Sequence, residues 1–408
     1  MDDDQDHGEE ALFGNSFLRD THAVQARLCA LAPVHRAVAP NGAQVWVVLR
    51  YDDAQAAFTD PRLSKDAAGL RAALAAKLGE SARGVALTRL VMPHMLHSDP
   101  PDHTRMRRLV VKAFTRRQIE SLRPRITEFA RALLDRLGGR SEADLVAEYA
   151  FPLPTMVISE LIGVPLEDQE RFRGWSDDFA RGGDPGEQAR AAGRITSYLA
   201  GRLPVVRAEP KDDLLSELVR AHDDDDDRLN DEELLGTVLL LMVAGHETSA
   251  NLIANGTLAL LRERGRWESV CAEPESLPGV IEELLRFDGP GTMASLRFTT
   301  AEVEIGGVAI PAGEIVLIGL SSANRDPARF RDPDRLDPRR EPKAHLAFGH
   351  GIHFCAGAQL ARMEAEIAFR ELTGRFPGMR LAAAPDRLSW RPSLLFRGLH
   401  ALPVAPGP

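Results

Sequence analysis

The stretch with the most distinctive chemistry is a glycine-punctuated loop that ends in a cysteine. It reads Phe348-Gly349-His350-Gly351-Ile352-His353-Phe354-Cys355-Ala356-Gly357, and a helical pattern follows directly. Gly349 and Gly351 allow backbone angles that a side chain would forbid. We expect Cys355 just before a helix, where free N–H groups and the helix dipole lower the pKa of a thiol. Such a thiolate suits a soft metal, for example haem iron, whereas the alternative is a buried structural cysteine beside a turn.

A second polar cluster, Ala244-Gly245-His246-Glu247-Thr248-Ser249, interrupts a long apolar helical pattern. Thr248 follows Ala244 by four residues, so its hydroxyl can donate to the Ala244 carbonyl and open the helix locally. A hydroxyl beside the Glu247 carboxylate can hold water and relay protons. The alternative is an ordinary buried helix whose Thr and Ser bond their own backbone. We expect His246 to face away from this groove and to pack elsewhere.

Two further stretches bring charged side chains together at helical spacing. His103 and Arg107 are four residues apart, so both point from one face and can clamp a carboxylate. Glu283 and Arg286 are three apart, a spacing that gives about 0.2–0.5 kcal/mol when the pair is exposed.

Composition limits the class of protein. The chain has 408 residues, of which 44% are hydrophobic, with three scattered cysteines and a net charge of −10. These values indicate a sizeable core and a reducing compartment, and they argue against nucleic-acid binding. The acidic start does not fit a signal peptide, and the longest uncharged apolar run, 234–245, is too short to span a bilayer. We therefore expect a cytoplasmic monomer that binds no membrane.

The order of elements predicts a mainly α chain with minor β sheets. Residues 34–36 and 45–48 flank Pro40-Asn41-Gly42 and predict a hairpin, and further strands are expected at 302–305, 308–310 and 314–319. Asn230 caps the longest helix, which extends to about Arg264 and is roughly 50 Å long. The other expected helices are 52–60, 103–137 apart from Pro124, 152–162, 166–180 and 187–207. Residues 1–15 are expected to be disordered, 67–95 to form a mobile apolar loop region, and 16–408 to form a single domain.

These motifs together resemble the cytochrome P450 family. The family's haem-ligand signature, Phe-Gly-x-Gly-x-His-x-Cys-x-Gly, is met at every position from Phe348 to Gly357. The resemblance spans nearly the whole chain. It implies a single triangular domain in which haem b lies between the long helix and the helix after Cys355, with Cys355 as the axial ligand of iron.

The resemblance also implies roles for the other motif residues. Glu247 and Thr248, with the carbonyl of Ala244, match the acid–threonine pair that delivers protons. His103, Arg107, Arg297 and His353 match contacts to the haem propionates, although Arg297 could also be an ordinary surface arginine. Phe348, Gly349 and Gly357 shape the loop. Glu283, Arg286 and Arg340 match a buried structural network that serves folding and haem retention.

The family's substrate positions fall on residues that composition alone would place equally well in the core: Val91, Met92, Met95, Val243, Ala244, Met293, Ala294, Leu395 and Phe396. The implied function is a monooxygenase that hydroxylates or epoxidises a small molecule with O2. A polyketide, macrolide or other secondary metabolite is the expected substrate. The alternatives are a terpenoid or steroid hydroxylase, a peroxide-using relative, and a haem-binding protein without turnover.

The chain has no fused redox domain, so the resemblance implies electrons from NAD(P)H through a separate reductase and ferredoxin. Between Asp102 and Glu120 there are six basic residues and no acidic ones. With Arg107 turned inward, the spacing predicts one basic helical face for an acidic ferredoxin, formed by Arg105, Arg108, Lys112 and Arg116. The alternative is a generic solvated basic face.

Overall fold

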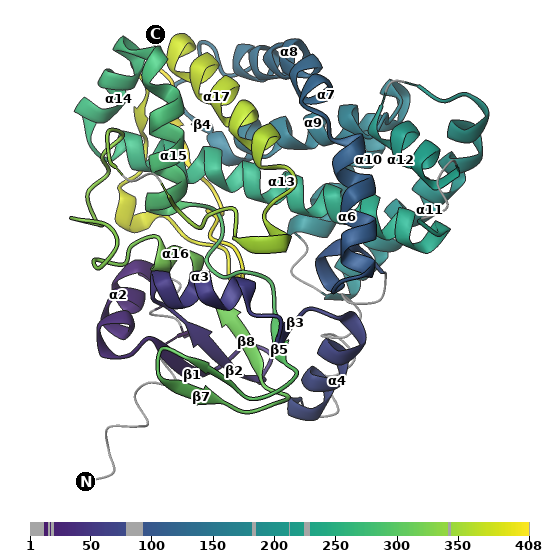
Figure 1. The fold of residues 1–408 in the computed structure, drawn as a ribbon. Helices are drawn as coiled ribbons and strands as arrows, with labels where there is room; N and C mark the ends of the chain where they lie inside the picture. The colour runs from purple at the N-terminus through teal and green to yellow at the C-terminus, as the bar shows by residue number, and fades with distance from the viewer. Residues whose placement is uncertain are drawn as a thin grey trace.

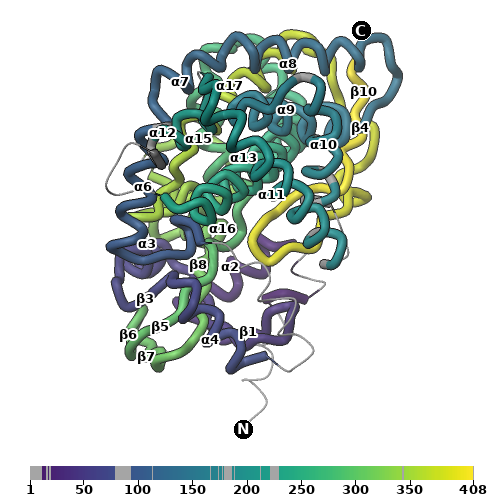
Figure 2. The backbone as a smooth tube through the Cα atoms, turned by 90° about the vertical axis from the view of Figure 1, so that its right-hand side faces the viewer, coloured from purple at the N-terminus to yellow at the C-terminus, as the bar shows by residue number. Residues whose placement is uncertain are grey.

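The computed structural model describes residues 12–14, 17, 20–78, 93–181, 185–211, 213–223, 229–341 and 344–407. Helices make up most of the molecule, and a small sheet region lies at one end (Figure 1). Figure 2, viewed at right angles, shows the same division, with helix α13 between the sheet region and helices α8 and α17. The predicted fold class, mainly α with minor β sheets, is confirmed.

The largest sheet joins strands from distant parts of the sequence in the order β1-β2-β8-β5-β3. The predicted hairpin is present, because β1 (Val34–Val38) pairs antiparallel with β2 (Gln44–Val48). β2 then pairs in parallel with β8 (Ile315–Ile318), which lies antiparallel to β5 (Arg297–Thr299). The remaining strands are β3 (Leu63–Ser64), the predicted pair β6 (Val303–Ile305) and β7 (Val308–Ile310), and the trio β4 (Ala143–Asp144), β10 (Pro403–Ala405) and β9 (Arg380–Leu381).

Helices α2 (Thr21–Leu31), α3 (Tyr51–Thr59), α4 (Ala67–Lys77) and α16 (Leu320–Ala323) accompany this sheet. Helix α3 confirms the predicted short helix. The segment expected to be a mobile loop region begins with the regular helix α4, which Asp66 caps by accepting a hydrogen bond from the Gly69 N–H. Residues 79–92 of that segment, and most of the terminus expected to be disordered, lie outside the described residues.

The helical stretch predicted for 103–137 consists of three helices. They are α6 (Asp102–Ala113), α7 (Arg116–Ser121) and α8 (Arg123–Asp135). The first break falls after Ala113 and not at Pro124, because Pro124 lies in the first turn of α8, where its missing N–H costs no helical hydrogen bond. Thr115 begins α7 with a reciprocal capping box to Gln118.

Helix α13 (Asp231–Leu261) crosses the molecule and is about 46 Å long at 1.5 Å per residue. The predicted cap is present, since the Asn230 side chain accepts from the Glu233 N–H while the Glu233 carboxylate accepts from the Asn230 N–H. The helices around α13 are α9 (Pro152–Leu161), α10 (Leu166–Arg181), α11 (Pro185–Ala208), α12 (Leu214–Asp223), α14 (Arg264–Ala272), α15 (Leu277–Asp288) and α17 (Ala358–Arg375).

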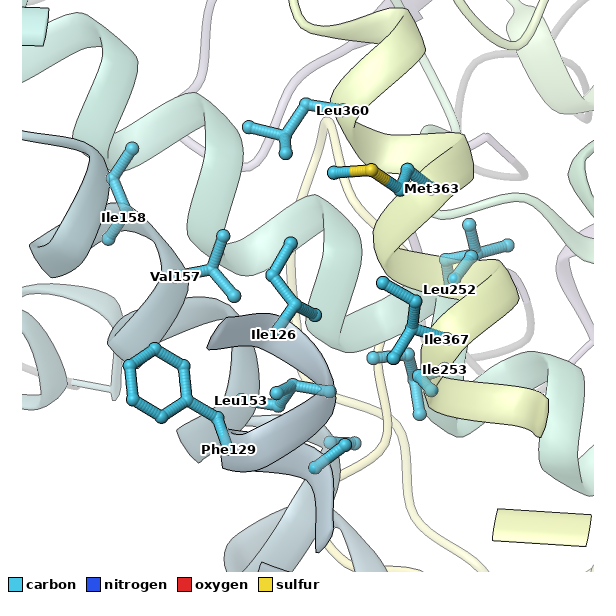
Figure 3. Packing of buried hydrophobic residues seen from close by; sticks show 14 of the residues in the cluster. Ile126, Phe129, Leu153, Val157, Ile158, Leu252, Ile253, Leu360, Met363 and Ile367 are labelled. Carbon is cyan, nitrogen blue, oxygen red and sulfur yellow. The ribbon is translucent and has the colours of Figure 1, made fainter. Parts of the chain in front are cut away.

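The main hydrophobic core forms where α13 meets α9 and α17, and where α8 packs on α9 and α17. Figure 3 shows part of this packing, with Val157 of α9, Ile253 of α13 and Met363 of α17 among the labelled residues of the cluster. Among the described residues, only α13 is long and apolar enough for a membrane span, and 56% of its most apolar window is buried within the protein. Its hydrophobicity is accounted for by its position as the core helix.

Candidate active site

The cysteine loop adopts the conformation that its glycines permit. Gly349 and Gly351 both have φ of 73°, in the left-handed region that side chains disfavour. A Cβ on Gly351 would also come within 3.2 Å of the Phe58 carbonyl oxygen. The Cys355 N–H donates to the Phe348 carbonyl oxygen at 2.9 Å, and α17 begins three residues later. The loop therefore presents Cys355 at the start of a helix, as predicted.

The expected lowering of the Cys355 pKa is wrong for the polypeptide itself. Cys355 retains accessible surface, but the surrounding protein withdraws its thiol from bulk water and raises the pKa. The Gly357 N–H and the guanidinium groups of Arg107 and Arg362 act in the opposite direction and do not overcome this desolvation. The position of Cys355 before a helix does not reveal the desolvation of its thiol, because desolvation depends on the packed structure. A coordinating metal cation would deprotonate the thiol directly.

On α13, the predicted hydrogen bond from the Thr248 hydroxyl to the Ala244 carbonyl oxygen is present at 2.6 Å. The helix is nevertheless continuous from Asp231 to Leu261, so the predicted local opening does not interrupt it. His246 is buried with its ring edge-on to Phe151 at 4.2 Å, as expected for a residue that packs on the opposite side. Glu247 lies beside Thr248 and forms an ion pair with Arg391, 3.1 Å between Oε1 and Nη2.

The residues predicted to bind propionates gather around the cysteine loop. His103, in the first turn of α6, is 2% exposed, and its ring lies 4.2 Å from that of His353. Arg297 is 4% exposed at the start of β5, which excludes the alternative of a surface arginine. Burial lowers the pKa of Arg297 to about 10. The pKa of His353 falls to about 2, because burial and the charges of Lys65, His103, Arg297 and Arg107 all disfavour a further cation.

Lys65 belongs to this cluster and was missed by the sequence reasoning. It is 2% exposed, and its ammonium donates to the Ser295 hydroxyl at 2.6 Å. Burial and the neighbouring Arg297 lower its pKa well below the ordinary value, with partial compensation from Asp99. Asp99 is also engaged by the Ser64 hydroxyl and the Lys65 N–H. A lysine after a short strand gives no sequence signal of burial, because the strand partner β5 lies more than 230 residues away.

These observations fit a flat group that carries carboxylates, as haem b does. Both ring nitrogens of the buried His103 lack a hydrogen-bond partner within the described structure. Lys65 and Arg297 are buried basic groups, and a further anion beside them would favour their charged forms. A Cβ added to Gly357 would meet nothing closer than the Cys355 sulfur at 4.0 Å, so the contacts within the chain do not require glycine there. A thiolate-bound haem needs a thiol to coordinate the iron, basic side chains to bind its carboxylates, and a residue without a side chain where the ring packs on the backbone. Cys355, the buried basic residues and Gly357 meet these three needs.

Arg107 and Arg105 each have a partner within the protein, and the prediction that Arg107 binds a propionate stays a prediction. The Arg107 guanidinium donates to the Phe354 carbonyl oxygen at 2.7 Å, so it holds the cysteine loop. Arg105 does not belong to an open basic face, because Glu233 of α13 pairs with it at 2.5 Å and 3.0 Å. The remaining basic residues also do not share one helix, since α6 ends at Ala113 and Arg116 lies on α7.

The predicted structural network is present and buried. Glu283 pairs with Arg286 through both carboxylate oxygens at 2.8 Å, and with Arg340 at 3.1 Å. Arg286 also donates to the carbonyl oxygens of Asn324 and Pro333. The network thereby fastens the segment that precedes the cysteine loop to α15.

The proposed substrate positions divide into buried residues, accessible residues and two residues that lie outside the described part of the chain. Met95 and Met293 are buried in hydrophobic core clusters, which favours the alternative of core packing for these two. Val243, Ala244, Ala294, Leu395 and Phe396 keep accessible surface. Thr292 donates its N–H to the Leu395 carbonyl oxygen at 2.8 Å, so the stretches 291–294 and 395–396 lie side by side. Val91 and Met92 lie outside the described residues.

Comparison with known proteins agrees with this geometry. The family model "Cytochrome P450" matches residues 201–377. Cytochrome P450 107B1 of Saccharopolyspora erythraea is 48% identical over 97% of each chain, and vitamin D(3) 25-hydroxylase of Pseudonocardia autotrophica is 44% identical over 97% of this chain and 96% of its own. The solved structure of the polyketide synthase cytochrome P450 PksS from Bacillus subtilis 168 matches with a TM-score of 0.87 and 38% identity, over 97% of this chain and 99% of its own. The chain therefore belongs to the cytochrome P450 family, and it is a haem-dependent monooxygenase of that family.

Proposed function

We propose that this monooxygenase hydroxylates or epoxidises a polyketide, a macrolide or a related secondary metabolite. In this reaction one atom of O2 enters the substrate and the other leaves as water, and NAD(P)H supplies two electrons through a reductase and a ferredoxin. The observation that carries the proposal is the cysteine loop, which presents Cys355 beside buried cations at the start of α17. The polyketide context of PksS supports the substrate class. We extend the proposal to a cytoplasmic protein with one domain over residues 16–408.

We assign the iron ligand to Cys355 and the propionate contacts to His103, Arg107, Arg297 and His353, and we add Lys65 to this group. A thiolate-bound haem supplies oxygen activation when it is present. The chain's own part is to hold and move protons near Thr248, whose hydroxyl is already oriented by the Ala244 carbonyl, with Glu247 as the adjacent acid.

We assign the substrate contacts to the five predicted positions that keep accessible surface. Val243 and Ala244 face the substrate from α13, and Ala294, Leu395 and Phe396 face it from the two paired loops. Apolar contacts of this kind orient a large ligand without binding it through charge.

A second candidate, oxidation of a steroid or terpenoid, is favoured by the 44% identity with vitamin D(3) 25-hydroxylase. The two candidates differ in the ligand that shifts the ferric Soret band from low to high spin. We expect larger shifts with 12- to 14-membered macrolactones than with vitamin D3 or myristic acid. A shift with vitamin D3 alone would support the second candidate.

The experiment has two further arms. Reduced protein with CO is expected to show the red-shifted Soret band of a thiolate-bound haem, and Cys355→Ser is expected to abolish it. Product formation from the binding macrolactone, with NADPH, ferredoxin and reductase, then tests turnover. A normal CO band without any product would identify a haem-binding protein that does not turn over.

A further inference from the structure

The acid of the proton-delivery pair is joined to a distant part of the chain. Oε1 of Glu247 lies 3.1 Å from Nη2 of Arg391, and the two side chains are 19% and 17% exposed. Partial burial makes such a pair stronger and better defined than an ion pair in open water. Arg391 belongs to the C-terminal segment and was not singled out from the sequence.

Arg391 is itself held in place. The same Nη2 donates to Oδ1 of Asn251 at 2.8 Å, and Asn251 is buried on α13 one turn after Glu247. The Arg391 N–H donates to the Gly398 carbonyl oxygen at 2.8 Å. A Cβ on Gly398 would come within 2.3 Å of Asn251 Oδ1 and 2.7 Å of Arg391 Nη2. The absence of a side chain at residue 398 is therefore a condition for this arrangement.

The segment that carries Arg391 also carries proposed substrate contacts. Trp390 bridges to Leu399, and the His400 N–H donates to the Ser389 carbonyl oxygen, so residues 389–391 and 398–400 form the two arms of a hairpin. Leu395 and Phe396 lie at its tip. The hairpin therefore joins these two proposed substrate contacts to the residue that pairs with Glu247.

We propose that Arg391 is a positioning residue that fixes the Glu247 carboxylate beside Asn251, at the position next to Thr248, and couples it to the substrate-contacting tip of this hairpin. This inference rests on the proposed function, because it assigns Glu247 to proton delivery. A purely structural ion pair would stabilise the hairpin without affecting the fate of the protons. The two possibilities differ in measurable ways.

The main variant is Arg391→Gln, and the matched control is Arg387→Gln, which removes an exposed arginine from the same segment. With the macrolactone that gives product, we expect Arg391→Gln to raise the share of NADPH electrons released as hydrogen peroxide about fivefold and to increase the solvent isotope effect on product formation. Arg391→Lys, which keeps the charge but not the planar fork, is expected to recover part of the coupling. Arg387→Gln is expected to match the wild type.

A double-mutant cycle separates positioning from structure. Glu247→Gln removes the group that Arg391 orients, so adding Arg391→Gln to it is expected to change the coupling no further. The proposal would be overturned if the two substitutions lowered the share of electrons that reaches product additively. It would also be overturned if Arg391→Gln, with a normal CO band, kept the wild-type share. If Arg391→Gln does not retain haem, the share of electrons released as peroxide is compared between the wild type and the variants Arg391→Lys and Asn251→Ser.

Hydrogen exchange provides a readout that does not depend on turnover. The proposal expects faster exchange in Arg391→Gln both in the hairpin and in the turn of α13 around Glu247. Faster exchange in the hairpin alone would indicate a structural pair and would count against positioning. If the wild type yields no product from any ligand, the proposed function fails, and the exchange result then decides the Arg391–Glu247 coupling by itself.

Discussion

At the scale of single residues, the most unusual carboxyl group outside the proposed haem contacts is Glu364 of α17. It is 3% exposed, its carboxyl lies near Ser249, the neighbour of Thr248 on α13, and its Oε1 has no hydrogen-bond partner among the described residues. Burial raises its pKa to about 8, so the carboxyl is protonated in the folded protein at neutral pH. Glu364 is therefore a neutral link between the helix that follows Cys355 and the proton-delivery helix.

This raised pKa predicts a stability that depends on pH. In the unfolded chain the group titrates near its ordinary value of 4.5, so folding binds a proton between there and about pH 8. The contribution of Glu364 is complete below pH 4.5 and is lost as pH rises to 8, by at most about 1.4 kcal/mol per unit. Glu364→Gln has no carboxyl to ionise at this position. The free energy of unfolding of Glu364→Gln is therefore expected to rise with pH relative to that of the wild type.

The measurement is urea unfolding of the haem-loaded protein at pH 5 and pH 8. Glu366→Gln, on the outer side of the same helix where Glu366 pairs with Arg370, is the matched control. An identical pH dependence in wild type and Glu364→Gln would contradict the raised pKa.

At the scale of elements, the Glu283 network connects α15 to the irregular segment that leads into the cysteine loop. Arg286 and Arg340 are 2% and 9% exposed in their side chains, and the Glu283 carboxylate pairs with both. It also accepts from the Asp337 N–H at 2.8 Å. Removal of one buried partner costs far more than removal of an exposed one, because the other charges remain desolvated.

We therefore expect Glu283→Gln to lower the free energy of unfolding by about 3–5 kcal/mol and to reduce haem retention. Glu268→Gln removes an exposed carboxylate that pairs with Arg264 at 2.7 Å, and it is expected to cost less than about 0.5 kcal/mol. Denaturant titration and the ratio of Soret to protein absorbance measure the two effects. Equal losses in both variants would show that burial of the network contributes little.

Across the whole molecule, charge and exposed apolar groups together predict a docking surface for the proposed ferredoxin. The chain carries a net charge of −10, yet Arg108, Lys112, Arg116 and Arg117 are exposed on α6 and α7. Val111 of α6 and Ile352 and Phe354 of the cysteine loop are large exposed hydrophobic residues, and Arg107 links that loop to α6. An apolar patch beside a basic rim is typical of a transient docking surface.

Lys112→Glu and Arg108→Glu are each expected to raise the apparent KM for ferredoxin roughly fivefold at low salt, and less at high salt. Arg27→Glu, at an exposed position on α2, provides the same charge change elsewhere and is expected to have little effect. Steady-state turnover against ferredoxin concentration at two ionic strengths measures this. Unchanged apparent affinities would place the docking surface on another face.

Features that depend on neighbouring residues could be predicted from the sequence. The glycine pattern predicted the loop at Cys355, Asn230 and Glu233 predicted the start of α13, and the i, i+4 spacing predicted the Thr248–Ala244 bond. Each of these results from backbone geometry or a contact within one helical turn. The family signature extended them to the fold, which the structure and the comparisons confirm.

Features that depend on burial and on partners distant in sequence required the folded structure. Arg105 meets Glu233 from 128 residues away, and Arg391 meets Asn251 from 140 residues away. Burial of Lys65 and desolvation of Cys355 likewise arise from elements that only folding brings together. Charge pairing and desolvation are properties of the space around a side chain, and residue type and spacing along the chain do not specify that space.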